Sequence, residues 1–276
     1  MAVGHSSFYA PGTIKIKLNQ ELVKQLLKVN EEHPFYGVRR LALELGWSEN
    51  KTRRIRNLAK LKIPVASKKH SYRRNTPEIL APANALRPYA MFKNQDRPQD
   101  GMDYSNMVNA EAWVQDFSYM KFSGSFCYLA VILDIKTRQV VGWRLGTNHS
   151  SELTYAAILD ALSKHSPPAI LHSDQGSEYL SHKHQLICDK LEIQLSCSDK
   201  SSPWQNGFME RWFNTFKTEF GSLSRFKDIS EVHEAIALQI HYYNTRRIHL
   251  ALKTTPANYA KSLIKTSHIV SGRVVA

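Results

Sequence analysis

The middle of the chain opens with three short segments dominated by apolar and aromatic residues. These β-prone segments are Trp113–Tyr119, Phe126–Asp134 and Gln139–Leu145. The last two are joined by a turn at Lys136-Thr137. Runs of this length, rich in β-branched and aromatic residues and bounded by turn residues, predict three consecutive strands.

Helix and strand patterns alternate after the third strand. Ser150 can cap a helix over 151–163, and a strand at 169–173, a helix at 182–190 and a short strand at 193–196 follow. This order predicts an α/β, ribonuclease-H-like fold with a mixed five-stranded sheet and flanking helices. In that fold the first and fourth strands are neighbours.

A further helix is predicted beyond residue 206. Its apolar residues recur at i, i+4, i+7 and i+11, as Met209, Phe213, Phe216 and Phe220. A second face, about a quarter-circle away, carries Glu210, Asn214 and Lys217. The polar face therefore lies at the edge of the buried face, where its side chains can reach a neighbouring strand end.

The N-terminal part of the chain has helical periodicity. One amphipathic helix is predicted from Ile14 to Val29, and two more between Pro34 and Lys60, separated by Gly46. Ser48 can cap the last of these, with Ile55 and Leu58 on its core side. Its other faces carry Lys51, Arg53, Arg54 and Arg56. A basic second helix after a glycine turn fits a small all-α, helix-turn-helix-like DNA-binding region, or a solvated helical hairpin.

Four regions are expected along the chain: helical residues 1–62, a basic proline-containing linker at 63–106, a catalytic core at 107–225, and a C-terminal helix with a basic tail at 226–276. Linker residues that can follow a phosphate backbone, or simply be solvated, are Lys68, Lys69, Arg73 and Arg74. Ser230 can cap the C-terminal helix, whose apolar face is Val232, Ile236, Ile240 and Tyr243. Arg246 and Arg247 follow it and can bind phosphate or favour the helix C-terminus.

The charge balance indicates a polyanionic partner. The formal net charge is +13, and the segment from Lys51 to Arg74 holds ten Lys or Arg and no acid. Clustered positive charge favours nucleic acid. Three cysteines, no signal-peptide pattern and no apolar run of membrane-spanning length predict a location in the cytoplasm and no membrane partner.

Three acidic residues are the candidate chemistry. Asp116 lies in the first predicted strand, Asp174 ends the fourth, and Glu210 lies on the helix after residue 206. Clustered carboxylates repel one another, and a bound cation relieves that repulsion. Carboxylate oxygens are the ligands that Mg²⁺ prefers, and two such ions support an in-line displacement at phosphorus.

These stretches resemble the DDE transposases of the insertion-sequence-three family (its second-reading-frame product), within the retroviral integrase superfamily. Between Asp174 and Glu210 lie 35 residues, which is the D,D(35)E spacing of that family. The matching stretches are Leu133-Asp134-Ile135 through Val141-Gly142-Trp143, 172–179, 202–210, Lys217, and Tyr243-Asn244 through His249 with Pro256. A departure is Asp116-Phe117-Ser118, where the family more often has an aliphatic residue and Thr.

The resemblance implies a bacterial, nucleoid-associated transposase that cuts transposon ends and transfers strands with two Mg²⁺ or Mn²⁺ ions. Asp116, Asp174 and Glu210 would then be the catalytic metal ligands, with Asn214 and Lys217 as phosphate contacts. Implied partners are double-stranded DNA (terminal repeats and target), a homo-oligomer on DNA, and an upstream-frame fusion partner. Alternatives are a DNA-binding subunit or regulator that is inactive without that partner, and a ribonuclease-H-like nuclease unrelated to transposition.

Two other site types are disfavoured. His182, His184, Cys188 and Cys197 do not have the spacing of a structural zinc site. His172-Ser173-Asp174 is not a hydrolase triad, because adjacent residues on a strand point to opposite faces.

Overall fold

A computed structural model describes residues 13–62, 81–89, 91–92, 102–103, 110–200 and 202–271. The chain divides into two compact units. The first, here called the helical unit, comprises Met1–Lys68 and Arg247–Thr254. The second, here called the sheet unit, comprises Lys69–Arg246 and Thr255–Ala276. None of the described helices is both long and apolar enough to cross a membrane.

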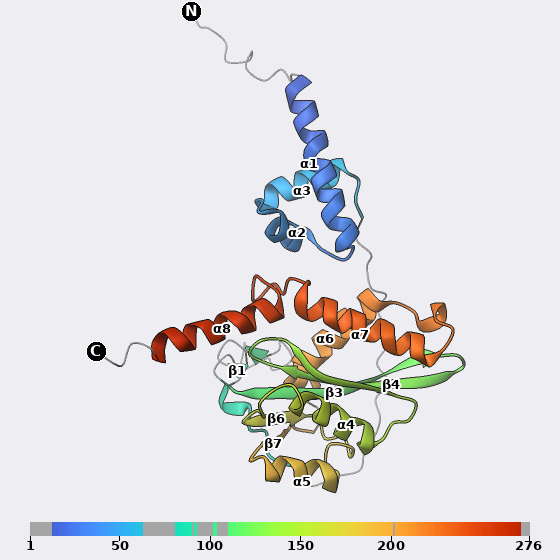
Figure 1. The fold of residues 1–276 in the computed structure, drawn as a ribbon, viewed down its shortest axis with the longest axis vertical. Helices are drawn as coiled ribbons and strands as arrows, with labels where there is room; N and C mark the ends of the chain where they lie inside the picture. Colours follow the sequence, from blue (N-terminus) through green and yellow to red (C-terminus); the bar gives the residue numbers. More distant parts are fainter. Residues whose placement is uncertain are drawn as a thin grey trace, which may run out of the picture. The chain divides into compact units, whose positions relative to one another are not determined.

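The helical unit contains α1 (Thr13–Glu32), α2 (Val38–Leu45) and α3 (Glu49–Leu58), drawn in blue in Figure 1. Gly46 ends α2 with a φ of 64°, a left-handed conformation that glycine adopts without steric cost. The Ser48 hydroxyl accepts a hydrogen bond from the Lys51 amide, which confirms the predicted cap of α3. Leu58 was expected in the core and is instead 54% exposed, whereas Ile55 is buried.

Residues 247–254 complete the core of the helical unit, although they are about 200 residues away in sequence. The Ile248 amide donates a hydrogen bond of 2.6 Å to the Tyr36 hydroxyl. The Arg40 Nε donates a bond of 3.0 Å to the Ile248 carbonyl. Ile248 packs in one apolar cluster with Tyr36 and Leu41. A local sequence pattern does not contain this pairing, so the helical unit is built from two separate parts of the chain.

The sheet unit is built on a mixed five-stranded sheet with the order β5-β4-β3-β6-β7. Its strands are β3 (Ala112–Phe122), β4 (Ser125–Asp134), β5 (Val140–Gly146), β6 (Ile170–Ser173) and β7 (Gln194–Cys197). The pairs β3–β4 and β4–β5 are antiparallel, while β3–β6 and β6–β7 are parallel. The predicted ribonuclease-H-like fold is therefore confirmed, including the first and fourth predicted strands as neighbours.

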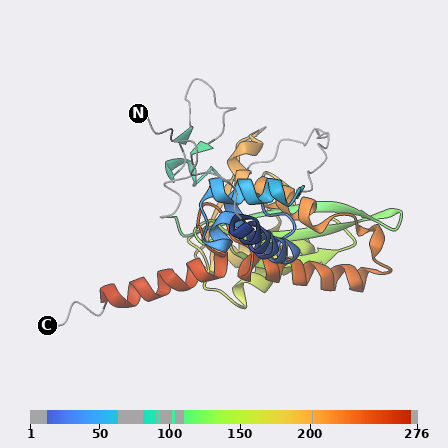
Figure 2. The ribbon, with the colours of Figure 1, turned by 90° about the horizontal axis from the view of Figure 1, so that it is seen from above.

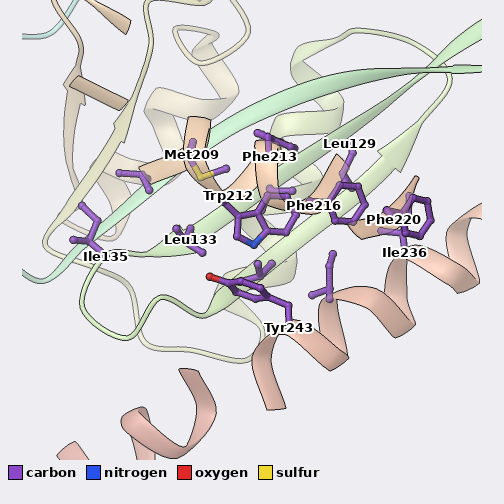
Figure 3. Close-up of a cluster of buried hydrophobic side chains, with 14 of the residues drawn as sticks. Leu129, Leu133, Ile135, Met209, Trp212, Phe213, Phe216, Phe220, Ile236 and Tyr243 are labelled. Carbon is purple, nitrogen blue, oxygen red and sulfur yellow. The ribbon is translucent and has the colours of Figure 1, made fainter. Parts of the chain in front are cut away.

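Helices cover both faces of this sheet (Figure 1). On one face, α4 (Ser151–Leu162) and α5 (His182–Lys190) bury Ala157, Ile158 and Cys188 against β3 and β4. On the other face lie α6 (Gly207–Phe220) and α7 (Ile229–Thr245). Figure 3 shows the α6 side chains, Trp212 among them, between those of β4 and α7. The four predicted apolar positions of α6 are all buried.

Gly142 on β5 brings α4 close to the sheet. A Cβ at this position would lie 2.5 Å from the Ala157 carbonyl oxygen and 2.7 Å from the Ala161 Cβ. No other side chain fits without moving the helix backbone. The glycine between Val141 and Trp143 is therefore a packing requirement.

Several local expectations were wrong or incomplete. Ser230 does not cap α7; Asp228 does, because its carboxylate accepts from the Ser230 and Glu231 amides. Ser150 is the N-cap residue of α4 but makes no side-chain capping bond. A helix α8 (Pro256–Ser271) was not predicted. Within the expected linker, β1 (Met91–Phe92) pairs with β2 (Met102–Asp103).

The described part of the expected linker is also joined to the sheet unit. Leu86 is buried in the same apolar cluster as α6 and α7. The Ala85 amide donates to the Ser196 hydroxyl at 2.9 Å, and the Asn84 side chain donates to Gln205 at 2.8 Å. These contacts hold residues 84–86 against the β7 side of the sheet.

Candidate active site

The parallel register of β3 and β6 aligns Asp116 with Asp174. Ala112 pairs with Ile170 and Val114 with His172. Two residues further along each strand, the same register brings Asp116 level with Asp174, just past the end of β6. Adjacent strands lie about 4.8 Å apart, and side chains two residues apart share a face. The two carboxylates therefore lie next to each other on one face of the sheet.

Asp116 has the most strongly perturbed carboxyl group of the site. Burial raises the pKa of this carboxyl well above its usual range, and the charge of Asp174 raises it further. A 2.8 Å hydrogen bond from the Phe117 amide opposes the rise, while Glu210 and Glu178 add to it. Three neighbouring carboxylates thus act on Asp116 in the same direction, which is the electrostatic setting that a cation relieves.

Asp174 is more exposed and is fixed by the turn that follows β6. Its Oδ1 accepts a 3.0 Å hydrogen bond from the Gly176 amide. Gln175 closes the same turn, because its side-chain amide donates to the Ser198 carbonyl at 3.0 Å. The surrounding protein desolvates the carboxyl and Glu178 repels it, and both effects raise its pKa.

Glu210 lies in the first turn of α6, whose start is joined to β3. The Asn206 side-chain amide donates a 3.2 Å hydrogen bond to the carbonyl of Gln115, the residue before Asp116. Met209 is fully buried, so the next residue on the helix, Glu210, lies at the edge of the packed face. Desolvation raises the pKa of the exposed Glu210 carboxyl. The stretch Asn206-Gly207 thus positions the helix that carries the third acid.

Two further residues of this site were not predicted, namely Glu178 and His149. Glu178 is only 7% exposed, and its Oε1 lies 3.2 Å from the His149 Nε2. The His149 ring in turn lies 4.2 Å from the Phe117 ring, centroid to centroid. A Cβ on Gly176 would lie 2.5 Å from Glu178 Oε1, so this carboxylate folds back over the turn that holds Asp174. The only sequence signal was an acid four residues after Asp174.

Tyr179 carries a buried hydroxyl with no hydrogen-bond partner among the described residues. The side chain is 2% exposed. Its pKa is raised well above the usual range by burial and by the negative charges of Asp116, Asp174 and Glu178. The phenol therefore lies near all three acids.

The donor set suits a hard divalent cation. All the acids are carboxylates; desolvation raises the pKa of each, and neighbouring carboxylates raise those of Asp116 and Asp174 further. Among the described residues, however, no group of three or more His, Cys, Asp or Glu side chains is close enough to hold a metal ion as it stands. Asp116 and Asp174 are neighbours on adjacent strands, while Glu210 is exposed on α6.

The predicted DNA-contact residues lie on different elements. On α3, Arg53 and Arg54 are exposed, Lys51 lies over the Trp47 ring, and Arg56 Nε donates to the Leu61 carbonyl. On α6, Asn214 is exposed and Lys217 Nζ lies 5.5 Å from the Tyr119 ring centroid. Arg246 is exposed, but Arg247 is 4% exposed in the helical unit, which leaves little of it for phosphate. Outside the described residues lie Lys68, Lys69, Arg73 and Arg74.

The disfavoured site types have structural explanations. His184 Nε2 lies 2.8 Å from the Gln115 side-chain nitrogen, and Cys188 is buried in the apolar cluster of α4 and α5. His172 lies between the hydroxyls of Ser196 (2.8 Å) and Ser198 (3.1 Å), and the Ser173 hydroxyl donates to the Asp174 carbonyl, so the three adjacent residues do not form a relay.

Comparisons with known proteins agree with this fold. Two models, each described as an integrase core domain, match residues 109–203 and 191–256. A relative from Lactococcus lactis, the transposase for insertion sequence element IS904, is 30% identical over 182 residues, covering 62% of this chain and 72% of the relative. The putative transposase InsK for element IS150 of Escherichia coli is 34% identical, covering 54% of each chain. An uncharacterized 31 kDa protein of element IS600 of Shigella sonnei is 34% identical, covering 51% of this chain and 53% of its own length.

Solved structures include two with a similar arrangement. One is a simian T-cell lymphotropic virus intasome in complex with PP2A regulatory subunit B56 gamma, with 16% identity, a TM-score of 0.48 and coverage of 85% of this chain and 73% of that chain. The other is the HTLV-2 integrase catalytic core domain in complex with magnesium, with 20% identity, a TM-score of 0.42 and coverage of 54% and 94%.

The integrase core models and the insertion-sequence transposases that this chain matches identify a polynucleotidyl transferase with an integrase core. More narrowly, the chain belongs to the insertion-sequence transposases, which are DDE transposases of the integrase superfamily. Its match spans 72% of the first of these relatives and about half of the next two.

Proposed function

We propose that this chain catalyses phosphodiester cleavage at transposon ends and the following strand transfer, through Asp116, Asp174 and Glu210. The observation that carries the proposal is the β3–β6 register, which aligns the two aspartates, together with the raised pKa of Asp116. An acid cluster with this much internal repulsion is not explained by packing.

Two divalent cations, Mg²⁺ or Mn²⁺, would supply activation of the attacking oxygen and stabilisation of the leaving oxygen. Asp116, within β3, and Asp174, just past the end of β6, would hold them, and Glu210 would complete the set from α6. The Asn206–Gln115 bond fixes the start of α6 beside Asp116, so only the outward-facing Glu210 side chain has to turn inward. Glu178, held by His149, would keep the Asp174 turn in place.

Each chemical step exchanges one phosphorus–oxygen bond for another. In cleavage, a water oxygen bonds to phosphorus, and the bond to the 3′ oxygen of the transposon strand breaks. That oxygen leaves with a proton as a 3′-hydroxyl. In strand transfer, this hydroxyl attacks a phosphodiester of the target, and the target's own 3′ oxygen leaves with a proton. No covalent protein–DNA intermediate is required.

The proposed substrate is double-stranded DNA, both as terminal repeats and as target, on the bacterial nucleoid in the cytoplasm. The helical unit supports this, because α3 carries Lys51, Arg53, Arg54 and Arg56 in two turns of helix. The net charge of +13 favours any polyanion. A homo-oligomer on DNA and an upstream-frame fusion partner are part of the same proposal.

The test is a cleavage assay on a labelled duplex that carries the inverted repeats flanking this chain's own element. Wild type, Asp174→Asn and Asp189→Asn are compared in Mg²⁺, Mn²⁺ and EDTA. Asp189 is an exposed acid on α5 and serves as the matched control. Cleavage should need metal, should be lost by at least 10³-fold in Asp174→Asn, and should persist in Asp189→Asn. Normal cleavage by Asp174→Asn would overturn the mechanism.

A second candidate is a DNA-binding subunit that is inactive until an upstream fusion partner is present. The observation in its favour is that the described acids do not already form a group of three around one ion position. Binding without cleavage by the isolated chain, with cleavage restored by the fused upstream frame, would select this candidate.

A further inference from the structure

A groove lies at the end of the sheet unit away from the acid cluster. One wall is the tip of the β3–β4 hairpin, and the other is the connection from α6 to α7. In both ribbon views these two segments lie at the same end of the sheet (Figures 1 and 2). The groove has a volume of about 430 Å³ and is lined by Lys121, Phe122, Ser123, Gly124, Ser222, Ser224, Phe226 and Lys227.

The lining of this hairpin groove is cationic and rich in hydroxyls. Each wall contributes one exposed lysine, Lys121 from β3 and Lys227 from the connection. The hydroxyls of Ser222 and Ser224 lie 2.9 Å apart, so one donates to the other and the pair presents a further donor to the groove. No carboxylate is among the lining residues.

The nearest acids in sequence are directed toward the start of α7. Asp228 Oδ1 accepts from the amides of Ser230 and Glu231. Glu231 Oε2 accepts from the Lys227 amide at 2.8 Å. Both carboxylates therefore hold main-chain donors, and the Lys227 ammonium is not neutralised by a recorded ion pair within the described residues.

The wall on the connection side is stiffened by aromatic stacking. The Arg225 guanidinium lies 5.0 Å from the Phe220 ring centroid and 4.6 Å from that of Phe226. The two rings are themselves stacked at 5.8 Å. This packing holds the short helix Leu223–Arg225 and the flanking Lys227 and Ser222 in a fixed arrangement.

Two lysines and several hydroxyls in an open groove suit a phosphodiester backbone. Lysine ammonium groups, serine hydroxyls and main-chain amides are the usual ligands of phosphate oxygens in DNA complexes. Such contacts position a duplex without reading its sequence. Phe122 and Phe226, both half-buried, add apolar surface to the lining, against which a sugar can pack.

The location of the groove relates it to the acid cluster. Lys121 is five residues beyond Asp116 on β3, which at about 3.3 Å per residue is about 17 Å along the strand, and the odd spacing directs the two side chains to opposite faces. A third lysine, Lys217, lies along this path against Tyr119. β6 pairs with β3 only at Ala112–Val114, so a duplex that runs along this edge of β3 beyond Asp116 would cover the length in about five base pairs, at about 3.4 Å per base pair.

We propose that the hairpin groove binds backbone phosphates of the DNA about five base pairs from the phosphodiester at the acid cluster, through Lys121 and Lys227. This inference rests on the proposed function, because it takes DNA at Asp116 as the reference point. The groove would set the direction in which the duplex leaves the site.

The first test measures the salt dependence of binding of the full chain to the terminal-repeat duplex. Lys121→Ala/Lys227→Ala is compared with Lys183→Ala/Lys190→Ala, which removes the same charge from exposed positions on α5, on the other face of the sheet. Each lost phosphate contact should reduce the magnitude of the slope of log affinity against log salt by about 0.9. The slope for Lys121→Ala/Lys227→Ala, the groove variant, should therefore be smaller in magnitude than that of wild type by about 2. The α5 variant should match wild type. Equal slopes for the two variants would overturn the proposal.

The second test measures position on the DNA. Lys121→Cys carrying a photo-crosslinker is bound to the duplex in the Asp174→Asn background, in which the duplex stays uncut. Crosslinks should cluster about five base pairs from the cleavage position. Crosslinks spread evenly along the duplex would overturn the assigned location. If the groove variant changes the slope but wild type never cleaves, the proposed catalysis fails and the groove stands; if wild type cleaves and the slopes are equal, only the groove fails.

Discussion

At the residue scale, two buried histidines make the sheet unit sensitive to acid. His172 and His184 are both fully buried, and burial lowers the pKa of each to about 4. In the unfolded chain they titrate near 6.5. The folded state therefore favours the neutral ring. The contribution of the two rings to the free energy of unfolding is complete above pH 6.5 and is lost as the pH falls toward 4. The loss amounts to roughly 3 kcal/mol for each residue.

We expect the free energy of unfolding, measured by urea denaturation, to decrease between pH 6.5 and pH 4. His184→Gln, which cannot titrate in this range, should show a smaller decrease than wild type shows. His182→Gln, on the exposed face of α5, is the control and should behave as wild type. If the free energy of unfolding decreases equally for His184→Gln and wild type between pH 6.5 and pH 4, the buried His184 ring is not responsible for the decrease.

The opposite sign applies to Asp116. Its pKa is raised in the fold, so the ionised group costs stability above its ordinary pKa near 4, and that cost disappears in stronger acid. Asp116→Asn keeps an oxygen for the Phe117 amide and removes the charge. We expect this variant to melt higher than wild type in EDTA at pH 7, by on the order of 1 kcal/mol or 2–4 °C.

Added Mg²⁺ should reverse this ranking, because a cation that binds the folded acid cluster stabilises wild type more than Asp116→Asn. Asp189→Asn is again the matched control and should respond to metal as wild type does. A melting temperature for Asp116→Asn below that of wild type in EDTA would contradict the repulsion inferred for this site.

At the scale of elements, the start of α7 is the sharpest difference between expectation and structure. Both Asp228 and Ser230 are residue types that cap helices, but only Asp228 accepts from the first amides. Asp228→Ala should cost about 1 kcal/mol of stability, while Ser230→Ala should change it by a few tenths at most. Thermal unfolding of both variants decides between them, and an equal loss would show that the cap is shared.

The sequence predicted the elements of the sheet well because each carries its own periodicity. The stripe of Met209, Phe213, Phe216 and Phe220 identified α6, and the alternating order identified the sheet topology. Asp116 was expected within the first predicted strand and Asp174 at the end of the fourth, and the parallel register of these strands brings the two residues level. By contrast, Leu58 was expected in the core because it shares a helical face with Ile55. Its exposure depends on which part of that face the rest of the helical unit covers, and local spacing does not contain this information.

The remaining site residues were not predictable because their roles arise from tertiary contacts. Glu178 is a site residue because the chain turns at Gly176 and folds its carboxylate over the Asp174 loop. His149 reaches it from the loop between β5 and α4, 29 positions earlier in the chain. Neither of these contacts leaves a periodic pattern in the sequence. The pairing of β1 with β2 and the burial of Leu86, both within the expected linker, also depend on tertiary contacts and were missed for the same reason.

At the scale of the whole molecule, the interleaving of the two units along the chain is the principal feature. The helical unit takes residues 247–254 from between α7 and α8 of the sheet unit. Its α1–α3 core therefore cannot be complete until most of the chain has been made. This arrangement also explains why Arg247 is buried beside Tyr36 rather than presented on a basic tail.

The bond between Tyr36 and Ile248 tests this interleaving directly. Tyr36→Phe keeps the ring, which is packed on His33 at 4.3 Å, and removes only the hydroxyl that accepts from the Ile248 amide. The amide is then left without its partner at a residue that is 8% exposed, at a cost of about 1–3 kcal/mol. Hydrogen–deuterium exchange of the full-length variant should show faster exchange at residue 248 and across α1–α3, with β3–β6 unchanged. Tyr155→Phe, on α4 of the sheet unit, is the control. If residues 247–254 stabilise the helical unit, the loss of the Tyr36 hydroxyl should speed exchange in the surrounding helices α1–α3. Unchanged protection of α1–α3 in Tyr36→Phe would mean that residues 247–254 contact the helical unit without stabilising it.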